Sequence, residues 1–300
     1  MNLRELLGKQ LLFFDGAMGT MLQQAGLPGG VLPETWNIER PEVVQDIHRQ
    51  YLAAGCQILK ANTFGANALK LRETPYQVDQ LIRQGIDLAR RAIVESGRDD
   101  CFVALDIGPS GKLLEPLGDL SFEAAYALFS EMAAAGEAAG ADAVLIETMG
   151  DTYEVKAAVL AAKEHTSLPV MVTMIFDERG KLLTGGDIPT VVALLEGLGV
   201  DAIGVNCGLG PKQMMGLLEE LLTCCSLPVA LNPNAGLPHS VDGRTVFDVE
   251  PEAFAGAMRT LAEKGAWLVG GCCGTTPAHL AAMTVACRGL TPPSVQPKNF

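Results

Sequence analysis

The chain has 300 residues, of which 48% are hydrophobic, and its formal net charge is −13. This length and composition suffice for a sizeable core in one or two domains. The 22 lysines and arginines form no basic run, so we expect no nucleic-acid partner. No apolar run approaches the ~20 residues that span a bilayer, and the charged N-terminal residues do not resemble a signal peptide. We therefore expect a soluble cytoplasmic protein without a membrane partner, whose eight cysteines are reduced.

Eight short apolar runs recur along the chain, as is typical of strands that are buried on both faces. They are residues 11–14, 57–60, 102–105, 143–146, 170–174, 202–205, 229–231 and 267–269. A helical pattern follows each run, and several of these patterns begin at a proline or an acidic cap. The expected helices are residues 41–54, 77–96, 121–139, 152–165, 188–198, 211–224, 251–264 and 277–287.

A strand followed by a helix, eight times over, predicts a single-domain α/β protein with a (β/α)8 TIM barrel over residues 1–290. Residues 291–300 contain prolines and are expected to form an extended C-terminal tail or the start of a linker. The alternative is an open, doubly wound sheet. It is disfavoured because no Gly-x-Gly-x-x-Gly pattern follows the first run.

Polar residues follow most of the apolar runs, at the strand ends where such barrels carry their chemistry. These polar segments are Asp15–Thr20, Asn62–Gly65, Asp106–Pro109, Glu147–Thr148, Asn206–Gly208, Asn232–Gly236 and Cys272–Gly274. They include three of the eight cysteines, and these follow the sixth and eighth runs, which are next-but-one neighbours in a closed barrel. The three thiols, at Cys207, Cys272 and Cys273, are therefore expected to face one cavity.

Two adjacent cysteines aim at one point only if the strand has already turned, and Gly270, Gly271 and Gly274 allow that turn. Three thiolates are a soft ligand set that suits Zn²⁺ and leaves a fourth position open. The alternative is that the thiols are small buried hydrophobic side chains. Spacing alone leaves both interpretations open for Cys207, Cys272 and Cys273. The buried interpretation is preferred for Cys56, Cys101, Cys224, Cys225 and Cys287. The four histidines are expected to be solvated or to cap helices.

The motifs at the strand ends resemble those of the homocysteine S-methyltransferase family, and most of all the N-terminal homocysteine-binding module of cobalamin-dependent methionine synthase. The resemblance runs from about residue 5 to residue 290. Its most specific part is the segment Gly270–Pro277, which reads GGCCGTTP. Asp15–Thr20, Asn62–Gly65, Asp106–Pro109, Asn206–Cys207 and Pro233–Gly236 also match.

This resemblance implies that one zinc ion per chain is bound by Cys207, Cys272 and Cys273, which are the catalytic residues. The homocysteine thiol then takes the open zinc position as a thiolate and attacks a methyl group, which gives methionine. A zinc ion with three thiolates is a poor agent for splitting water, but it activates a thiol nucleophile.

The residues expected to bind the amino-acid part of the substrate are Asp15, Gly16, Ala17, Met18, Glu147 and Asn234. Asp15 and Glu147 suit the ammonium group, although a turn cap and a salt bridge are the alternative roles for these two carboxylates. The glycine-rich turn offers backbone N–H groups to the carboxylate. The resemblance places Asn234 near zinc, where it would fill the open position without substrate. Thr63 and Asp106 are further candidates to line the pocket, and Asn206 is the candidate for a structural role.

The methyl donor is predicted from aromatic content. A quaternary ammonium donor such as betaine requires aromatic faces, and only Phe14, Phe64 and Trp36 are candidates near the rim. This favours a methyl-corrinoid, carried by a corrinoid-binding domain of the same protein or by another protein. The alternatives are a stand-alone enzyme that uses betaine or S-methylmethionine, and a non-catalytic module that binds zinc and thiols. The segment Gly26–Asn37 is a candidate lid.

Overall fold

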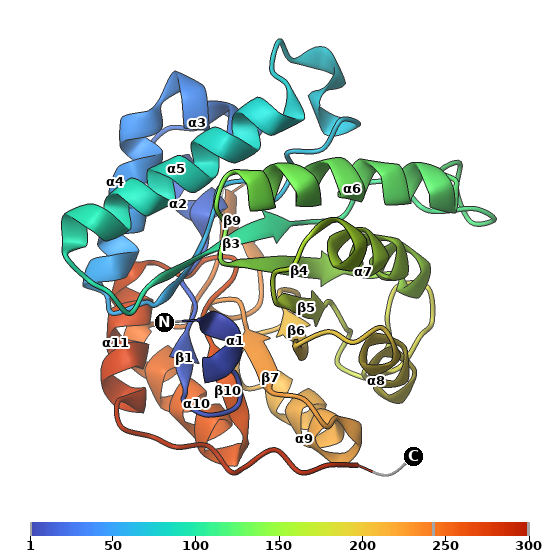
Figure 1. Cartoon of the computed structure of the whole chain (residues 1–300). Coiled ribbons are helices and arrows are strands. Elements are labelled where there is room, and N and C mark those ends of the chain that lie inside the picture. Colours follow the sequence, from blue (N-terminus) through green and yellow to red (C-terminus); the bar gives the residue numbers. More distant parts are fainter. Residues whose placement is uncertain (1, 242–243, 299–300) are drawn as a thin grey trace.

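The computed structural model describes residues 2–241 and 244–298, and it shows the predicted TIM barrel. Eight parallel strands pair in the order β1-β10-β7-β6-β5-β4-β3-β2. A parallel bridge between Phe14 and Ile58 joins the first and last strands of this order and closes the sheet. Helices surround the closed sheet (Figure 1).

The strands of the barrel are β1 (Leu12–Phe13), β2 (Ile58–Lys60), β3 (Phe102–Ile107), β4 (Ala143–Met149), β5 (Val170–Met174), β6 (Ala202–Asn206), β7 (Val229–Asn232) and β10 (Ala266–Val269). The helices that follow them are α4 (Pro41–Ala53), α5 (Val78–Ser96), α6 (Phe122–Ala138), α7 (Thr152–His165), α8 (Ile188–Gly197), α9 (Met214–Cys224), α10 (Pro251–Lys264) and α11 (Pro277–Cys287). Each of these elements overlaps a segment predicted from the sequence. The largest shifts are at α9, which starts at Met214 because residues 211–213 form a turn, and at β4, which continues to Met149 instead of ending at residue 146.

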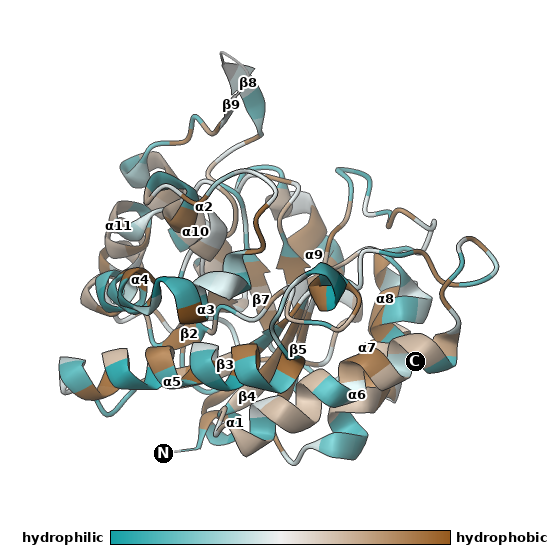
Figure 2. Ribbon diagram, turned by 90° about the horizontal axis from the view of Figure 1, so that it is seen from above, coloured by the Kyte–Doolittle hydropathy of each residue, from teal (hydrophilic) through white to brown (hydrophobic). Residues whose placement is uncertain are grey.

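The structure also contains short helices and strands outside this framework that were not predicted from the sequence. They are α1 (Leu3–Leu6), α2 (Met18–Gln24), η1 (Pro33–Thr35), α3 (Trp36–Glu39), η2 (Lys70–Glu73), β8 (His239–Val241) and β9 (Arg244–Val246). The last two form an antiparallel hairpin that projects from the ring of helices (Figure 2). None of the described helices is long and apolar enough to cross a membrane.

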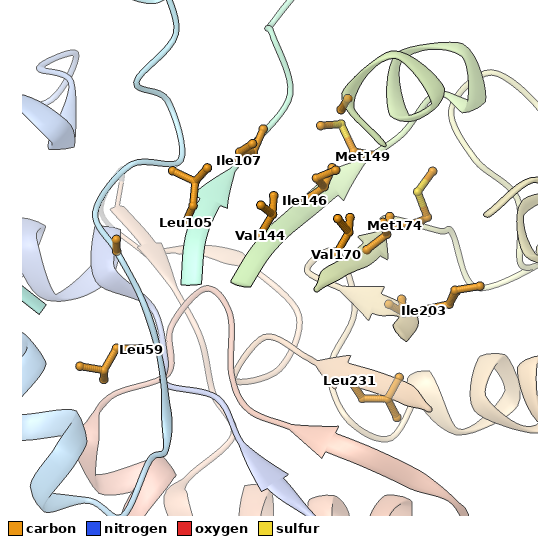
Figure 3. Packing of buried hydrophobic residues seen from close by; sticks show 14 of the residues in the cluster. Leu59, Leu105, Ile107, Val144, Ile146, Met149, Val170, Met174, Ile203 and Leu231 are labelled. Atoms are coloured by element: carbon orange, nitrogen blue, oxygen red, sulfur yellow. The ribbon is translucent and has the colours of Figure 1, made fainter. Parts of the chain in front are cut away.

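Alternate side chains of the strands form two separate apolar layers. One set, which includes Leu105, Val144, Ile146 and Ile203, packs against the surrounding helices (Figure 3). The other set fills the interior of the barrel, and it contains Leu12, Phe14, Ile58, Phe102, Ala104, Ala143, Leu145, Met171, Ala202, Ala230 and Leu268. The barrel is therefore a packed core below its mouth, and only the upper layer of inward side chains is free to form a site.

The N-terminal side of the barrel is closed by the two ends of the described chain. Leu3 of α1 belongs to the interior cluster, and Val295 packs against the same cluster. The Trp267 indole N–H donates a hydrogen bond to the Pro293 carbonyl at 3.1 Å. These contacts leave the opposite face, at the C-terminal ends of the strands, as the open side of the barrel.

The histidine prediction is wrong for His48. This side chain lies on α4, is 0% exposed, and has no hydrogen-bond partner for either ring nitrogen among the described residues. His279 does cap a helix, because it forms a capping box with Thr276 at the start of α11. His165 is exposed on α7. The apolar face of α4 therefore includes an uncharged imidazole.

Replacing His48 with leucine should reduce the loss of stability in acid. Burial lowers the pKa of His48 from 6.5 to about 4, so between these values only the unfolded chain binds the proton. The free energy of unfolding therefore falls as the pH drops from 6.5 toward 4, by about 2 kcal/mol at pH 5. Urea unfolding at pH 8 and pH 5 should show that His48→Leu removes this loss and that His165→Leu retains it. An unchanged pH dependence in His48→Leu would contradict this account.

Candidate metal centre and substrate pocket

Three thiols meet at the open side of the barrel. Cys207 follows β6, and Cys272 and Cys273 follow β10. Their Sγ atoms all lie within 4.8 Å of one another, and those of Cys207 and Cys273 are 3.7 Å apart. Within residues 2–241 and 244–298, this is the one group of three histidine, cysteine or acidic ligands with such a geometry. The expected convergence of the three cysteines is present.

The glycines around the paired cysteines serve different purposes. At Gly270 an added Cβ would lie 2.5 Å from the Cβ of Phe14, and at Gly271 it would lie 2.4 Å from Thr275 Oγ1. These two glycines are therefore required for space. Gly274 has a φ of +79° and provides the turn, and an added Cβ there would also lie 2.4 Å from the Phe247 ring. The Cys272 N–H donates to the Pro233 carbonyl at 2.8 Å, which fixes the turn against the end of β7.

Asn206 supports the thiol cluster from below. Its side-chain oxygen accepts hydrogen bonds from the Thr148 N–H and the Thr173 hydroxyl, both at 2.8 Å. Its amide nitrogen donates to Thr148 Oγ1 at 2.7 Å and lies 3.8 Å from Cys272 Sγ. Thr148 and Cys207 both have positive φ values, of 63° and 58°, which are strained for residues other than glycine. The Asn206 amide thus holds Thr148 beside the Cys272 thiol, and Asn206 directly precedes the second strained residue, Cys207.

The thiol cluster fits a tetrahedral zinc ion. Sulfur ligands at about 2.3 Å from zinc would lie roughly 3.8 Å apart, close to the Cys207–Cys273 separation of 3.7 Å. Hydrogen bonds from Cys272 and Cys273 lower the pKa of Cys207, and the hydrogen bonds with Cys207 raise the pKa values of Cys272 and Cys273. The contacts within the cluster therefore favour ionisation of Cys207 and oppose ionisation of Cys272 and Cys273. A bound divalent cation would favour the thiolate form of all three.

A cavity of about 430 Å³ opens above the three thiols. Residues 16–20, 32–34, 61, 62, 64 and 65 form much of its wall. Its floor contains Lys60, Asp106 and Glu147 in addition to the cysteines. Each of these three charged residues lies two positions beyond an apolar side chain of the barrel interior, and these apolar side chains are Ile58, Ala104 and Leu145. The strand periodicity therefore directs the charged groups into the mouth.

Lys60 is the central charge of this floor and is 5% exposed. Its Nζ lies 3.7 Å from Glu147 Oε2 and 4.0 Å from Asp15 Oδ1, and it donates to the Gly271 carbonyl at 3.2 Å. Burial alone would lower the pKa of Lys60, but the charges of Glu147 and Asp15 outweigh burial and raise it. The ammonium group therefore remains charged.

Three buried carboxyl groups, those of Asp15, Asp106 and Glu147, lie close enough to act on the charge of Lys60. Burial raises the pKa values of Asp15 and Glu147 to about 7, against the opposing effect of Lys60. Burial, with the charge of Glu147, also raises the pKa of Asp106. Asp15 Oδ1, Asp106 Oδ1 and Glu147 Oε2 are buried and accept no hydrogen bond from the described residues. This excess of unpaired acceptors suits a second, external cation.

Most of the predicted substrate residues are at this cavity. Gly16, Ala17, Met18 and Glu147 line it, and Asp15 lies beside Lys60. The glycine-rich turn is shorter than expected because α2 begins at Met18. The Ala17 N–H already donates to Thr275 Oγ1 at 3.2 Å, so this donor is engaged within the protein.

Asn234 and Thr63 are placed differently from the lining residues. Asn234 is 2% exposed, and its Oδ1 is buried without a hydrogen-bond partner in the described parts of the chain. Thr63 exchanges hydrogen bonds with the backbone of Asp106, at 2.9 and 3.0 Å, and therefore supports the floor from outside the cavity. Asp106 itself lines the cavity, as expected.

Only one of the three candidate aromatic rings reaches the cavity. Phe64 lines it, whereas Phe14 lies in the barrel interior and Trp36 in the core around the barrel. Lys70 Nζ stands 5.4 Å from the centre of the Phe64 ring. The described lining therefore contains no aromatic cage for a quaternary ammonium group.

Part of the expected lid forms one wall of the cavity. Leu32, Pro33 and Glu34 line it. Glu34 Oε1 accepts a hydrogen bond from the Gly65 N–H, and Asn62 Nδ2 donates to the Pro33 carbonyl at 2.8 Å. These bonds attach the segment to the loop that follows β2.

Lys60 was missed by sequence reasoning, which treated residues 57–60 as an apolar run. A signal was present, because a lysine at the end of a buried strand requires a partner. Strand periodicity places its side chain on the same face as that of Ile58, which is the barrel interior.

Comparison with known proteins agrees with this geometry. The family profile described as homocysteine S-methyltransferase matches residues 12–287. The chain belongs to the homocysteine S-methyltransferase family. The family resemblance drawn from the motifs is therefore confirmed.

Solved structures and curated relatives place the chain within this family. The metallated form of the homocysteine methyltransferase MmuM from Escherichia coli is 27% identical, with a TM-score of 0.79, over 94% of this chain and 99% of that one. Methionine synthases of Mycobacterium leprae and Mycobacterium tuberculosis are 36% and 35% identical over 97% and 98% of this chain. The matched region is 26% of each methionine synthase, so the chain spans about a quarter of the length of these relatives.

Replacing Asn206 with leucine should weaken zinc binding although all three cysteines remain. The change removes the amide that orients Thr148 and Cys272, and loss of such a supporting group typically lowers metal affinity about 10–100-fold. Competition with a chromophoric chelator would measure the affinity.

Asn232→Leu is the matched control for Asn206→Leu. Asn232 pairs with Asn206 in the sheet register, but its side chain makes no hydrogen bond to the described residues. It should therefore retain near wild-type zinc affinity. Equal losses in the two variants would show that the Asn206 contacts do not support the metal centre.

Proposed function

We propose that this protein is a zinc-dependent homocysteine S-methyltransferase that produces methionine. The observation that carries the proposal is the combination, in one cavity, of three convergent thiols and a floor with unpaired carboxylate oxygens. The thiols suit a metal that activates a sulfur nucleophile. The carboxylates suit the ammonium group of an amino acid. Membership of the family supports both assignments.

Cys207, Cys272 and Cys273 are the proposed zinc ligands. Zinc with three thiolate ligands supplies a Lewis acid that lowers the pKa of an incoming thiol and leaves it nucleophilic. The strained backbone at Cys207 and the glycine-bounded turn at Cys272 hold the ligand atoms in place before the substrate arrives. Asn234, whose side-chain oxygen is buried and unpaired, is proposed to approach the metal when no substrate is bound.

Asp15 and Glu147 are proposed to bind the substrate ammonium group through their unpaired oxygens. The turn of Gly16, Ala17 and Met18 lines the same cavity and is proposed to contact the amino-acid part of the substrate. Together these groups orient homocysteine so that its sulfur points toward the cysteines. The sulfur then takes a methyl group from a donor that enters from the open side of the barrel.

The proposed donor is a methyl-corrinoid carried by another domain or another protein. The single aromatic residue among the described lining residues, Phe64, supports this choice, since Lys70 already places a positive charge near its ring. The length of the methionine synthase relatives, about four times that of the matched region, leaves room for such a domain.

A second candidate is a self-sufficient enzyme with a small donor such as S-methylmethionine or betaine. The match to almost the whole of the Escherichia coli homocysteine methyltransferase favours it, because that protein is no larger than this barrel. A module that binds zinc and a thiol without turnover would share the same site and form no methionine.

The donor assay separates these functions. The zinc-loaded protein is incubated with homocysteine and, in separate reactions, with methylcobalamin, S-methylmethionine or betaine, and methionine is measured. Of the three donors, we expect only methylcobalamin to give methionine. The Cys273→Ala variant should give none, because one zinc ligand is lost. Methionine from S-methylmethionine or betaine would instead establish the self-sufficient enzyme. No methionine from any donor would contradict the proposed activity.

A further inference from the structure

We propose that Lys60 makes the pocket selective for a zwitterionic thiol, by binding the carboxylate of the substrate beside the carboxylates that bind its ammonium group. This inference rests on the proposed function and assigns a residue that determines its substrate specificity. It concerns the amino-acid end of the substrate and not the metal.

Lys60 has hydrogen-bonding capacity that the protein does not use. An ammonium group has three N–H donors, and one of them is directed to the Gly271 carbonyl at 3.2 Å. The distances of Nζ to Glu147 Oε2 and Asp15 Oδ1, 3.7 and 4.0 Å, are those of ion pairs and exceed hydrogen-bond length. Among the described residues no other hydrogen bond of Nζ is present, so two donors of this nearly buried cation remain available at the floor of the cavity.

The neighbouring acceptors are also unused. Asp15 Oδ1, Asp106 Oδ1 and Glu147 Oε2 have no hydrogen-bond partner among the described residues. The floor thus presents donors on Lys60 and acceptors on Asp106 and Glu147, with the Asp15 carboxyl group beside Lys60. An α-amino acid carries its ammonium and its carboxylate on one carbon, so both must be recognised within one small space. Lys60 Nζ lies 3.7 Å from Glu147 Oε2 and 4.0 Å from Asp15 Oδ1, so a cation and carboxyl groups are close enough to contact both charges of one amino acid.

The charge balance explains why Lys60 is needed. Without it, the floor and the adjoining Asp15 would offer carboxyl groups to an ammonium group and no cation to a carboxylate. Lys70, the other cation among the described lining residues, lies in the wall beside Phe64 and Gly111. Lys60 is therefore the cation placed to bind the substrate carboxylate next to these carboxyl groups.

Titration calorimetry tests this role without turnover, by measuring the affinity of the zinc-loaded protein for three thiols. The thiols are homocysteine, 3-aminopropane-1-thiol, which lacks the carboxylate, and 4-mercaptobutyrate, which lacks the ammonium. Lys60→Met should lower the affinity for homocysteine and for 4-mercaptobutyrate about 30-fold or more, because the buried charge partner of their carboxylates is lost. Binding of 3-aminopropane-1-thiol should stay the same or tighten. Equal losses for all three thiols, or a loss confined to 3-aminopropane-1-thiol, would overturn the proposal.

Two further measurements guard against a general structural effect. Lys60→Arg keeps the charge and should keep the preference for homocysteine over 3-aminopropane-1-thiol. Lys163→Met is the matched control, because Lys163 also donates to a glycine carbonyl, that of Gly199, but is exposed and far from the pocket lining. It should bind all three thiols as the wild type does.

The wild-type protein alone gives an independent answer. Its affinity for homocysteine should exceed that for 3-aminopropane-1-thiol, and equal affinities would overturn the role of Lys60 even if no variant folds. The proposed function fails in a different way, since the wild type would then bind none of the three thiols through its metal.

Discussion

The alternation of side chains along parallel strands is the constraint on which this site depends. Each strand of the barrel sends every second side chain inward, and the lower inward layers are apolar and tightly packed. The last inward positions, at Lys60, Asp106, Glu147 and Asn206, are polar. The same geometry that fills the barrel therefore delivers a ring of buried polar groups to its mouth, where few partners are available and a ligand can provide them.

The polar ring and the thiol cluster are joined by short contacts. Asn206 touches Cys272 and also fixes Thr148, the residue after Glu147. Lys60 connects the carboxylates to the carbonyl of Gly271, the residue before Cys272. The proposed metal site and the proposed amino-acid site are consequently two parts of one packed unit.

Much of this arrangement could be predicted from the sequence, because strong local signals agree with the fold. Apolar runs and proline starts located the eight strands and helices, and the glycine-flanked Cys272–Cys273 pair located the thiol cluster. The short elements α2 and α3 were not predicted, since their sequences are too short to show helical periodicity. His48 was misplaced because a buried, unpaired imidazole has no sequence signature.

The roles of Lys60 and Asn206 depend on contacts between strands that are far apart in the chain. Lys60 meets Gly271 across 211 residues, and Asn206 meets Thr148 across 58. No local pattern encodes such pairings. The Lys60 contact follows from closure of the barrel, which brings β2 next to β1 and thereby close to β10. The Asn206 contact joins the ends of β6 and β4, which lie on either side of β5 in the sheet.

The central claim is that the three thiols hold a zinc ion whose remaining position accepts the substrate sulfur. X-ray absorption at the zinc edge tests it most directly, with spectra of the zinc-loaded protein before and after homocysteine is added. The account predicts three sulfur ligands at about 2.3 Å alone and four with homocysteine. A sulfur count that stays at three, or zinc that is not bound by sulfur, would contradict it.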